Sequence, residues 1–141
     1  IKDDSRDIEF INNVVYNYGD NGLTADDSLV HVEANTFIAG EDSVERAPIA
    51  LRHTDPQAVS YFTQGNTGAI RGNGKVSATH VFEPSGVQVL SAREAFDEVL
   101  ATAGAREPAL DAVDVQVISD VQNIEGKIIN SPADLGFPDL N

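Results

Sequence analysis

The sequence of 141 residues contains no cysteine, no methionine and no tryptophan. Without cysteine the chain forms no disulfide bridge and no thiolate-ligated metal site. A primary translation product begins with Met, whereas this chain begins with Ile1, so we expect a processed product or a fragment of a longer protein. No run reaches the roughly 18 apolar residues of a membrane span, so we expect no membrane partner.

Basic side chains are also scarce. Lys and Arg number 9 against 23 for Asp and Glu, which gives a formal net charge of −14. The basic residues are scattered between Lys2 and Lys127 without forming a cluster. Such a surface repels polyanions, so nucleic acid is not an expected partner. The acidity is typical of a soluble protein, and an anionic ligand would need local basic residues or bridging cations.

Short β-branched or aromatic runs occupy the first part of the chain, residues 1–86. Each run is long enough for a strand and too short for a helix, and Gly and Asn-Gly pairs separate the runs. The predicted strands are Ile8–Ile11, Val14–Tyr18, Leu29–Val32, Thr36–Ile38, Ile49–Leu51, Val59–Thr63 and Val76–Phe82.

The second part, residues 87–141, changes to a helical period. Ser91 and Glu94 form a capping box, apolar residues recur at helical spacing after it, and Gly104 is a suitable stop. A second helix is predicted to begin at Asp111 and to end at Gly126. The residues that this helix is predicted to bury are Val113, Val117, Ile118 and Val121.

The chain therefore divides into strands over residues 1–86 and a helical tail over residues 87–141 that caps and packs on them. After the second helix we expect one more helical turn at Ser131–Asp134. The final residues predict an extended segment that Phe137 and Leu140 anchor.

Three of the strands run into an asparagine, and β-forming residues resume directly after it. These residues are Asn13, Asn35 and Asn66, at intervals of 22 and 31 residues. Such a unit is typical of a solenoid, in which an Asn at a repeated bend tolerates left-handed geometry and bonds the Asn of the next coil. The longer interval predicts an insertion of about nine residues near Glu41–Ala47. The pattern is equally compatible with an antiparallel sandwich whose loops contain Asn.

Several segments resemble one family. Asp7–Gly19 (DIEFINNVVYNYG) resembles the D-hydrophobic-x-x-NNVxYNxG coil of secreted bacterial pectate lyases, and Val32–Gly40 (VEANTFIAG) is similar to their next coil. The tail is similar to that of the same group, except that Gly136–Pro138 lacks the Trp of the usual Gly-Gly-Trp-Pro. The matching tail stretches are SAREAFDEVL from Ser91, AGA from Ala103, DAVD from Asp111 and GKIINSPAD from Gly126.

This resemblance implies the C-terminal coils of an all-β, right-handed parallel β-helix with a short α-helical tail. It implies a secreted enzyme that cleaves polygalacturonate or pectin by calcium-assisted β-elimination, in which Ca²⁺ joins enzyme carboxylates to substrate uronates. The family's base, an Arg, and its calcium-binding Asp residues fall upstream of Ile1. The chain alone is therefore expected to hold neither the catalytic base nor a metal site, and its implied partner is the N-terminal portion of the same protein.

Five residues are candidates for contact with substrate. Lys2 and Arg6 follow the implied catalytic segment closely, and both side-chain types bind carboxylates. Tyr18, Asp20 and Asn21 come at the strand end and loop after the NN coil, where loops of β-helix enzymes often border the substrate cleft.

The three histidines predict no metal site. His31 alternates with Val30 and Val32 and is expected to point outward from a strand. His31, His53 and His80 do not stand at a ligand spacing. The alternative to the enzyme is a noncatalytic β-helix module that binds a carbohydrate or another surface.

Overall fold

The computed structural model describes residues 1–2, 4–44, 47–129 and 131. In this part of the chain, strands in parallel sheets dominate, and two short helices follow them. The predicted final segment with Phe137 and Leu140 lies outside the described residues, as does all of the predicted turn at Ser131–Asp134 except its first residue.

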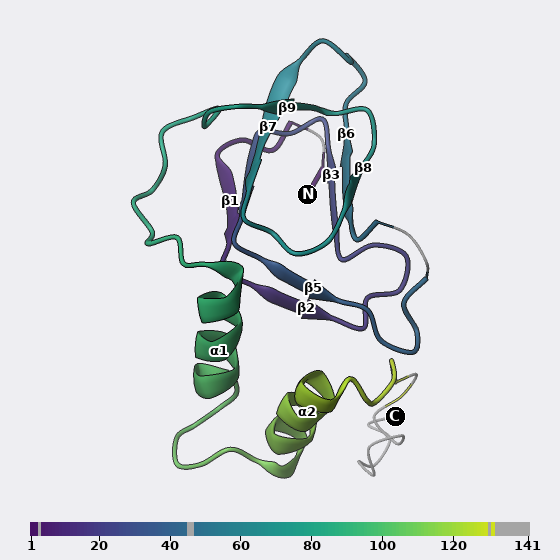
Figure 1. Ribbon diagram of the computed structural model, residues 1–141, viewed down its shortest axis with the longest axis vertical. Helices are drawn as coiled ribbons and strands as arrows, with labels where there is room; N and C mark the ends of the chain where they lie inside the picture. The colour runs from purple at the N-terminus through teal and green to yellow at the C-terminus, as the bar shows by residue number, and fades with distance from the viewer. Residues whose placement is uncertain (3, 45–46, 130, 132–141) are drawn as a thin grey trace.

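The strands form three sheets, here called A, B and C. Sheet A has the order β1 (Ile8–Ile11), β4 (Val30–Glu33), β7 (Val59–Gln64), β9 (Lys75–Ser77). Sheet B pairs β2 (Val14–Tyr16) with β5 (Thr36–Ile38). Sheet C has the order β3 (Leu23–Asp26), β6 (Ile49–Arg52), β8 (Ile70–Arg71). The chain passes through A, B and C in this order twice, and on the third pass it goes from β7 of A to β8 of C and then to β9 of A (Figure 1). Each pass is called a coil below.

All pairings between these strands are parallel, which excludes the antiparallel sandwich for the described residues. The register also locates the extra residues of the second coil. Val14 pairs with Thr36, 22 residues on. Leu23 pairs with Ile49, 26 residues on, and Val30 pairs with Tyr61, 31 residues on. The single insertion predicted near Glu41–Ala47 is therefore wrong, because four residues enter before β6 and five enter between β6 and β7.

Alternation along each strand builds the core. In β4, Val30 and Val32 point into the interior, so His31 and Glu33 take the outer face. The same alternation holds in the neighbouring sheets and gives one continuous apolar cluster. Its buried members are Leu23, Ala25, Val30, Val32, Phe37, Ile49, Leu51 and Tyr61.

The three repeated asparagines hydrogen-bond one another at the bend between sheets A and B. Asn13 Nδ2 donates to Asn35 Oδ1 at 2.9 Å, and Asn35 Nδ2 donates to Asn66 Oδ1 at 2.8 Å. The left-handed backbone expected at these asparagines falls one residue earlier. Positive φ angles occur at Asn12 (56°), Ala34 (53°) and Gly65 (67°), so the side chain of each following Asn is turned toward the next coil.

The predicted strands are confirmed with four differences. Strand β2 ends at Tyr16, two residues before the predicted end at Tyr18. Strands β3 and β8 are additional, because LTAD (23–26) and a two-residue strand at 70–71 carry too few apolar residues to be recognised. Strand β9 ends at Ser77, and the chain then leaves the sheet rather than continuing to Phe82.

Both helices are confirmed. Helix α1 (Ala92–Thr102) begins after the Ser91 capping box and contacts β2 and β5. Helix α2 (Ala112–Asn123) begins after Asp111, which caps it, and it ends before Ile124, a C-cap in left-handed geometry, rather than at Gly126. The predicted burial is wrong at Val117, which is 54% exposed, and α2 has no fully buried residue.

Candidate functional site

Two arginines lie on the outer face of sheet C. In β6, Ile49 and Leu51 point into the core, so the outer face carries Ala50 and Arg52. Arg71 of β8 pairs in register with Ala50 and takes the same face. Neighbouring strands of this acidic protein thus present two arginines on one face of sheet C, and guanidinium groups bind anionic ligands.

Acidic and amide groups hold both arginines only in part. Arg52 Nη1 lies 3.6 Å from Asp26 Oδ1, which is too far for a good hydrogen bond. Arg71 Nη2 donates to Asn21 Oδ1 and lies 4.0 Å from Asp20 Oδ2. Asp26 Oδ1 and Arg71 Nε are buried and have no hydrogen-bond partner among the described residues.

A second polar site lies at the turn that follows sheet C. A hollow of about 300 Å³ is lined there by Asp4, Arg6, Asp27, His53 and Thr54. The Asp27 carboxylate accepts from the Thr54 N–H at 2.7 Å and from its hydroxyl at 2.9 Å. These bonds favour the ionised carboxylate, so they hold the pKa of Asp27 below its ordinary value. Arg6 is paired with Asp4 at 2.9 Å.

The lowered pKa of Asp27 predicts an acid-labile turn. Ionised Asp27 stabilises the fold fully above its unfolded pKa of about 3.9, and this contribution is lost as the pH falls through the lower folded value. Thr54→Val removes only the hydroxyl bond, so we expect the pKa of Asp27 to rise toward its ordinary value. Carboxyl-carbon NMR titration measures the pKa of Asp27 in this variant, and Thr102→Val on α1 is the control. An unchanged Asp27 titration in Thr54→Val would contradict the assignment.

The structure separates the five residues predicted to contact substrate into two pairs and Tyr18. Asp20 and Asn21 lie before β3 and meet Arg71, which sequence reasoning missed. Arg6 lies in the hollow beyond the other end of β3, and Lys2 is exposed in the segment before it. The outer face of sheet C connects the two pairs. Tyr18 is half-buried and packs against the core cluster.

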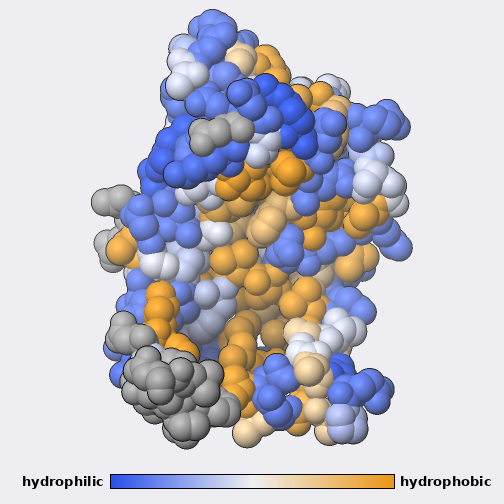
Figure 2. Space-filling view, turned by 180° about the vertical axis from the view of Figure 1, so that it is seen from behind, coloured by the Kyte–Doolittle hydropathy of each residue, from blue (hydrophilic) through white to orange (hydrophobic). Residues whose placement is uncertain are grey.

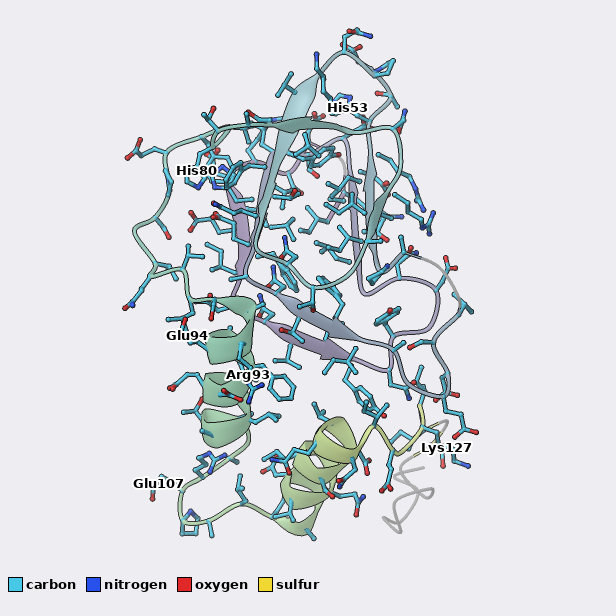
Figure 3. The ribbon with its side chains drawn as sticks, viewed as in Figure 1. His53, His80, Arg93, Glu94, Glu107 and Lys127 are labelled. Atoms are coloured by element: carbon cyan, nitrogen blue, oxygen red, sulfur yellow. The ribbon has the colours of Figure 1, made fainter. Side chains whose placement is uncertain are left out.

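A histidine cluster lies on the outer face of sheet A. Residues 78–90, here called the return segment, run from β9 back toward α1 outside this sheet (Figure 1). They bring His80 to His31, with ring centroids 4.6 Å apart, and His80 Nε2 lies 3.3 Å from Glu33 Oε1. His31 points outward as expected, but the return segment buries it completely. Figure 3 shows His80 and His53 on different sides of the coil.

Hydrogen bonds fix the return segment on sheet A. The Val81 N–H donates to His31 Nε2 at 3.1 Å, and burial lowers the pKa of His31. Glu9 accepts from both the backbone N–H and the hydroxyl of Ser85, which lowers the pKa of Glu9. Asn12 accepts from the Leu90 N–H at 3.0 Å.

The described residues do not fit a resident calcium ion. Calcium takes six to eight oxygen ligands. Among residues 1–2, 4–44, 47–129 and 131, the one group of three His, Asp or Glu ligand atoms close enough to share an ion is His31, Glu33 and His80. Two of these three donors are imidazole nitrogens, which suit transition metals rather than calcium.

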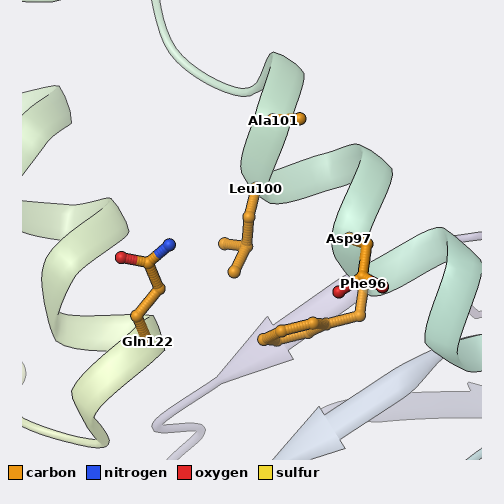
Figure 4. A pocket seen from close by; sticks show the side chains of 5 residues that line it. All are labelled: Phe96, Asp97, Leu100, Ala101 and Gln122. Atoms are coloured by element: carbon orange, nitrogen blue, oxygen red, sulfur yellow. The ribbon is translucent and has the colours of Figure 1, made fainter.

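Another hollow lies away from both polar sites. It occupies about 340 Å³ between α1 and α2 (Figure 4). Phe96 and Leu100 line it from α1, and Gln122 from α2. Its one charged lining group, Asp97, is paired with Arg93 at 2.9 Å, so the hollow lacks the convergent polar groups of a binding site.

In the part of the chain that the structure describes, no helix is long and apolar enough to cross a membrane. Neither a scan against protein-family models nor a search of curated proteins found a match to this chain.

Proposed function

We propose that the chain forms coils of a right-handed parallel β-helix in a secreted pectate lyase, and that the outer face of sheet C borders the polygalacturonate chain. Three parallel sheets that the chain visits in the same order in its first two passes support the β-helix, and parallel crossover connections are almost always right-handed. The hydrogen-bonded row of Asn13, Asn35 and Asn66 is here called the Asn ladder, and its first two members lie in segments that resemble the family. The observation that carries the proposal is the pair Arg52 and Arg71 on adjacent strands of an acidic protein.

These arginines bind and orient the substrate in this proposal. Polygalacturonate carries one carboxylate on each sugar, and a guanidinium binds a carboxylate through two parallel hydrogen bonds. Arg71 is 30% exposed and Arg52 is 44% exposed, so both reach solvent while their stems rest on the sheet. Abstraction of the C5 proton needs a base, which the resemblance assigns to a segment ahead of Ile1.

One end of the coil is suited to that segment. Figure 2 shows hydrophobic side chains gathered across the end opposite to the viewer of Figure 1, where the edge strands β1 and β2 lie. Half-buried Ile8, Phe10 and Val15 pack against the core from these strands. The N-terminus already pairs with β3, since Ile1 donates to the Thr24 carbonyl. Preceding coils of the same protein would bury this surface and continue the sheets.

Substrate binding tests the role of the arginines. Losing one charge-assisted hydrogen bond costs about 1.5–3 kcal/mol, so Arg71→Ala should weaken binding of oligogalacturonate by about tenfold or more. Isothermal titration of the full chain at low salt measures the affinity. Arg93→Ala on α1 removes the same charge from an 83% exposed side chain and serves as the matched control. Equal affinity losses in both variants would contradict a specific site.

Lyase activity tests the reaction itself. The chain is assayed together with the family's segment ahead of Ile1, and ultraviolet absorbance follows the unsaturated uronate product with and without a chelator. Calcium-dependent product release supports the lyase. Binding without any product would favour the noncatalytic module, and the absence of both would overturn the proposal.

A further inference from the structure

We propose that His31, Glu33 and His80 bind one divalent transition-metal ion of the zinc class, which fastens the return segment to the outer face of sheet A. This site is independent of the proposed function, because it lies on another sheet and uses none of the residues assigned to substrate.

The ligand atoms already converge. One atom from each of the three side chains lies within 4.8 Å of the other two. Glu33 Oε1 and His80 Nε2 are 3.3 Å apart, close to the roughly 3.3 Å that separates two ligands on a tetrahedral ion with bonds of about 2.0–2.1 Å. Two imidazoles and one carboxylate are a typical zinc ligand set that leaves a fourth position for water.

The hydrogen bonding of His31 selects the ligand atom. Nε2 accepts from the Val81 N–H, so the lone pair of Nε2 points to the return segment and the ring proton lies on Nδ1. Nδ1 is buried without a hydrogen-bond partner among the described residues, and Glu9 Oε1 lies 3.8 Å from it. A metal-bound His usually donates its second N–H to a carboxylate. An ion on Nε2 would replace the Val81 bond and give Glu9 this role.

The surroundings bury two of the three ligands, His31 and Glu33, and leave the third, His80, partly exposed. His31 is completely buried, and Phe82 stacks on its ring at a centroid distance of 3.7 Å. The Glu33 side chain is 4% exposed, so its carboxylate is removed from water and favours a nearby cation. The His80 side chain is 40% exposed, which leaves the ion a path from solvent. The ion would thus bridge β4 and a segment 47 residues further along the chain.

Metal titration of the full chain tests the site. After removal of metals with a chelator, the protein is titrated with Zn²⁺ by calorimetry and with Co²⁺ by visible absorption, whose intensity reports tetrahedral coordination. We expect one tightly bound ion and a rise in melting temperature, because a ligand that binds only the folded state stabilises it. The imidazole resonances of His31 and His80 should shift together in the NMR spectrum.

Three variants separate the site from unspecific binding. His80→Ala and Glu33→Gln should each weaken Zn²⁺ binding at least tenfold and abolish the rise in melting temperature. His53→Ala removes a histidine at another turn and should bind as the parent does. Unchanged Zn²⁺ affinity in both site variants, an equal loss in His53→Ala, or no Zn²⁺ binding by the parent would overturn the proposal. If His80→Ala fails to fold, the Zn²⁺ affinity of Glu33→Gln alone tests the proposal.

Discussion

Replacing Asn35 with alanine should destabilise the fold by about 3–5 kcal/mol, because the side chain is fully buried and makes four hydrogen bonds. Its Oδ1 accepts from the backbone N–H and from Nδ2 of Asn13, both at 2.9 Å. Its Nδ2 donates to the Phe10 carbonyl at 2.7 Å and to Asn66 Oδ1 at 2.8 Å. Alanine leaves the Asn13 N–H and the Phe10 carbonyl without these partners inside the bend.

Urea unfolding followed by circular dichroism measures the loss of stability. Asn73→Ala is the matched control, since Asn73 also makes two hydrogen bonds, to His53, but is exposed. Water replaces those bonds, so we expect this variant to lose about 1 kcal/mol or less. If both variants lose the same free energy, the buried ladder does not stabilise the coil.

The ladder also shows how far the sequence could predict the fold. The spacing of Asn13, Asn35 and Asn66 was sufficient to place a repeated bend, because strands run into each of them. The backbone at that bend was misplaced by one residue. Ala34 adopts the left-handed conformation there, against its own preference, because the buried Asn35 bonds hold the bend in place. Tertiary hydrogen bonds decided a local conformation that composition does not predict.

The polar sites were harder to predict for a different reason. Asn21 was predicted to contact substrate, but its partner Arg71 stands 50 residues later, and only the register of sheet C brings them together. His31 and His80 meet because the chain leaves sheet A after β9 and returns across it. Period-2 alternation placed His31 on the outer face, yet no local pattern indicates which later segment covers that face.

Replacing Gly72 with alanine should destabilise the protein by about 3 kcal/mol or more. Gly72 has a φ of +114°, outside the conformations open to residues with a side chain. A β-carbon there would lie 1.9 Å from the backbone oxygen of Leu51, which belongs to β6 and the core. The Leu51 oxygen also accepts from the Gly74 N–H at 3.0 Å, so it is held in place. The strands β6 and β8 would have to separate.

Two other glycines separate the two causes of this destabilisation, the backbone strain of a positive φ and the clash of the added β-carbon. Gly86 has a φ of +87° and Gly19 does not have a positive φ, and neither would bring a β-carbon within 4 Å of another atom. Gly86→Ala should therefore lose only about 1 kcal/mol from backbone strain, and Gly19→Ala close to nothing. Thermal and urea unfolding rank the three variants by their stability. If Gly72→Ala were as stable as Gly86→Ala, the close approach of β6 would not constrain this turn.

A shift of the backbone at residue 72 would also displace the adjacent Arg71, so Gly72→Ala should lose oligogalacturonate binding while Gly86→Ala keeps it.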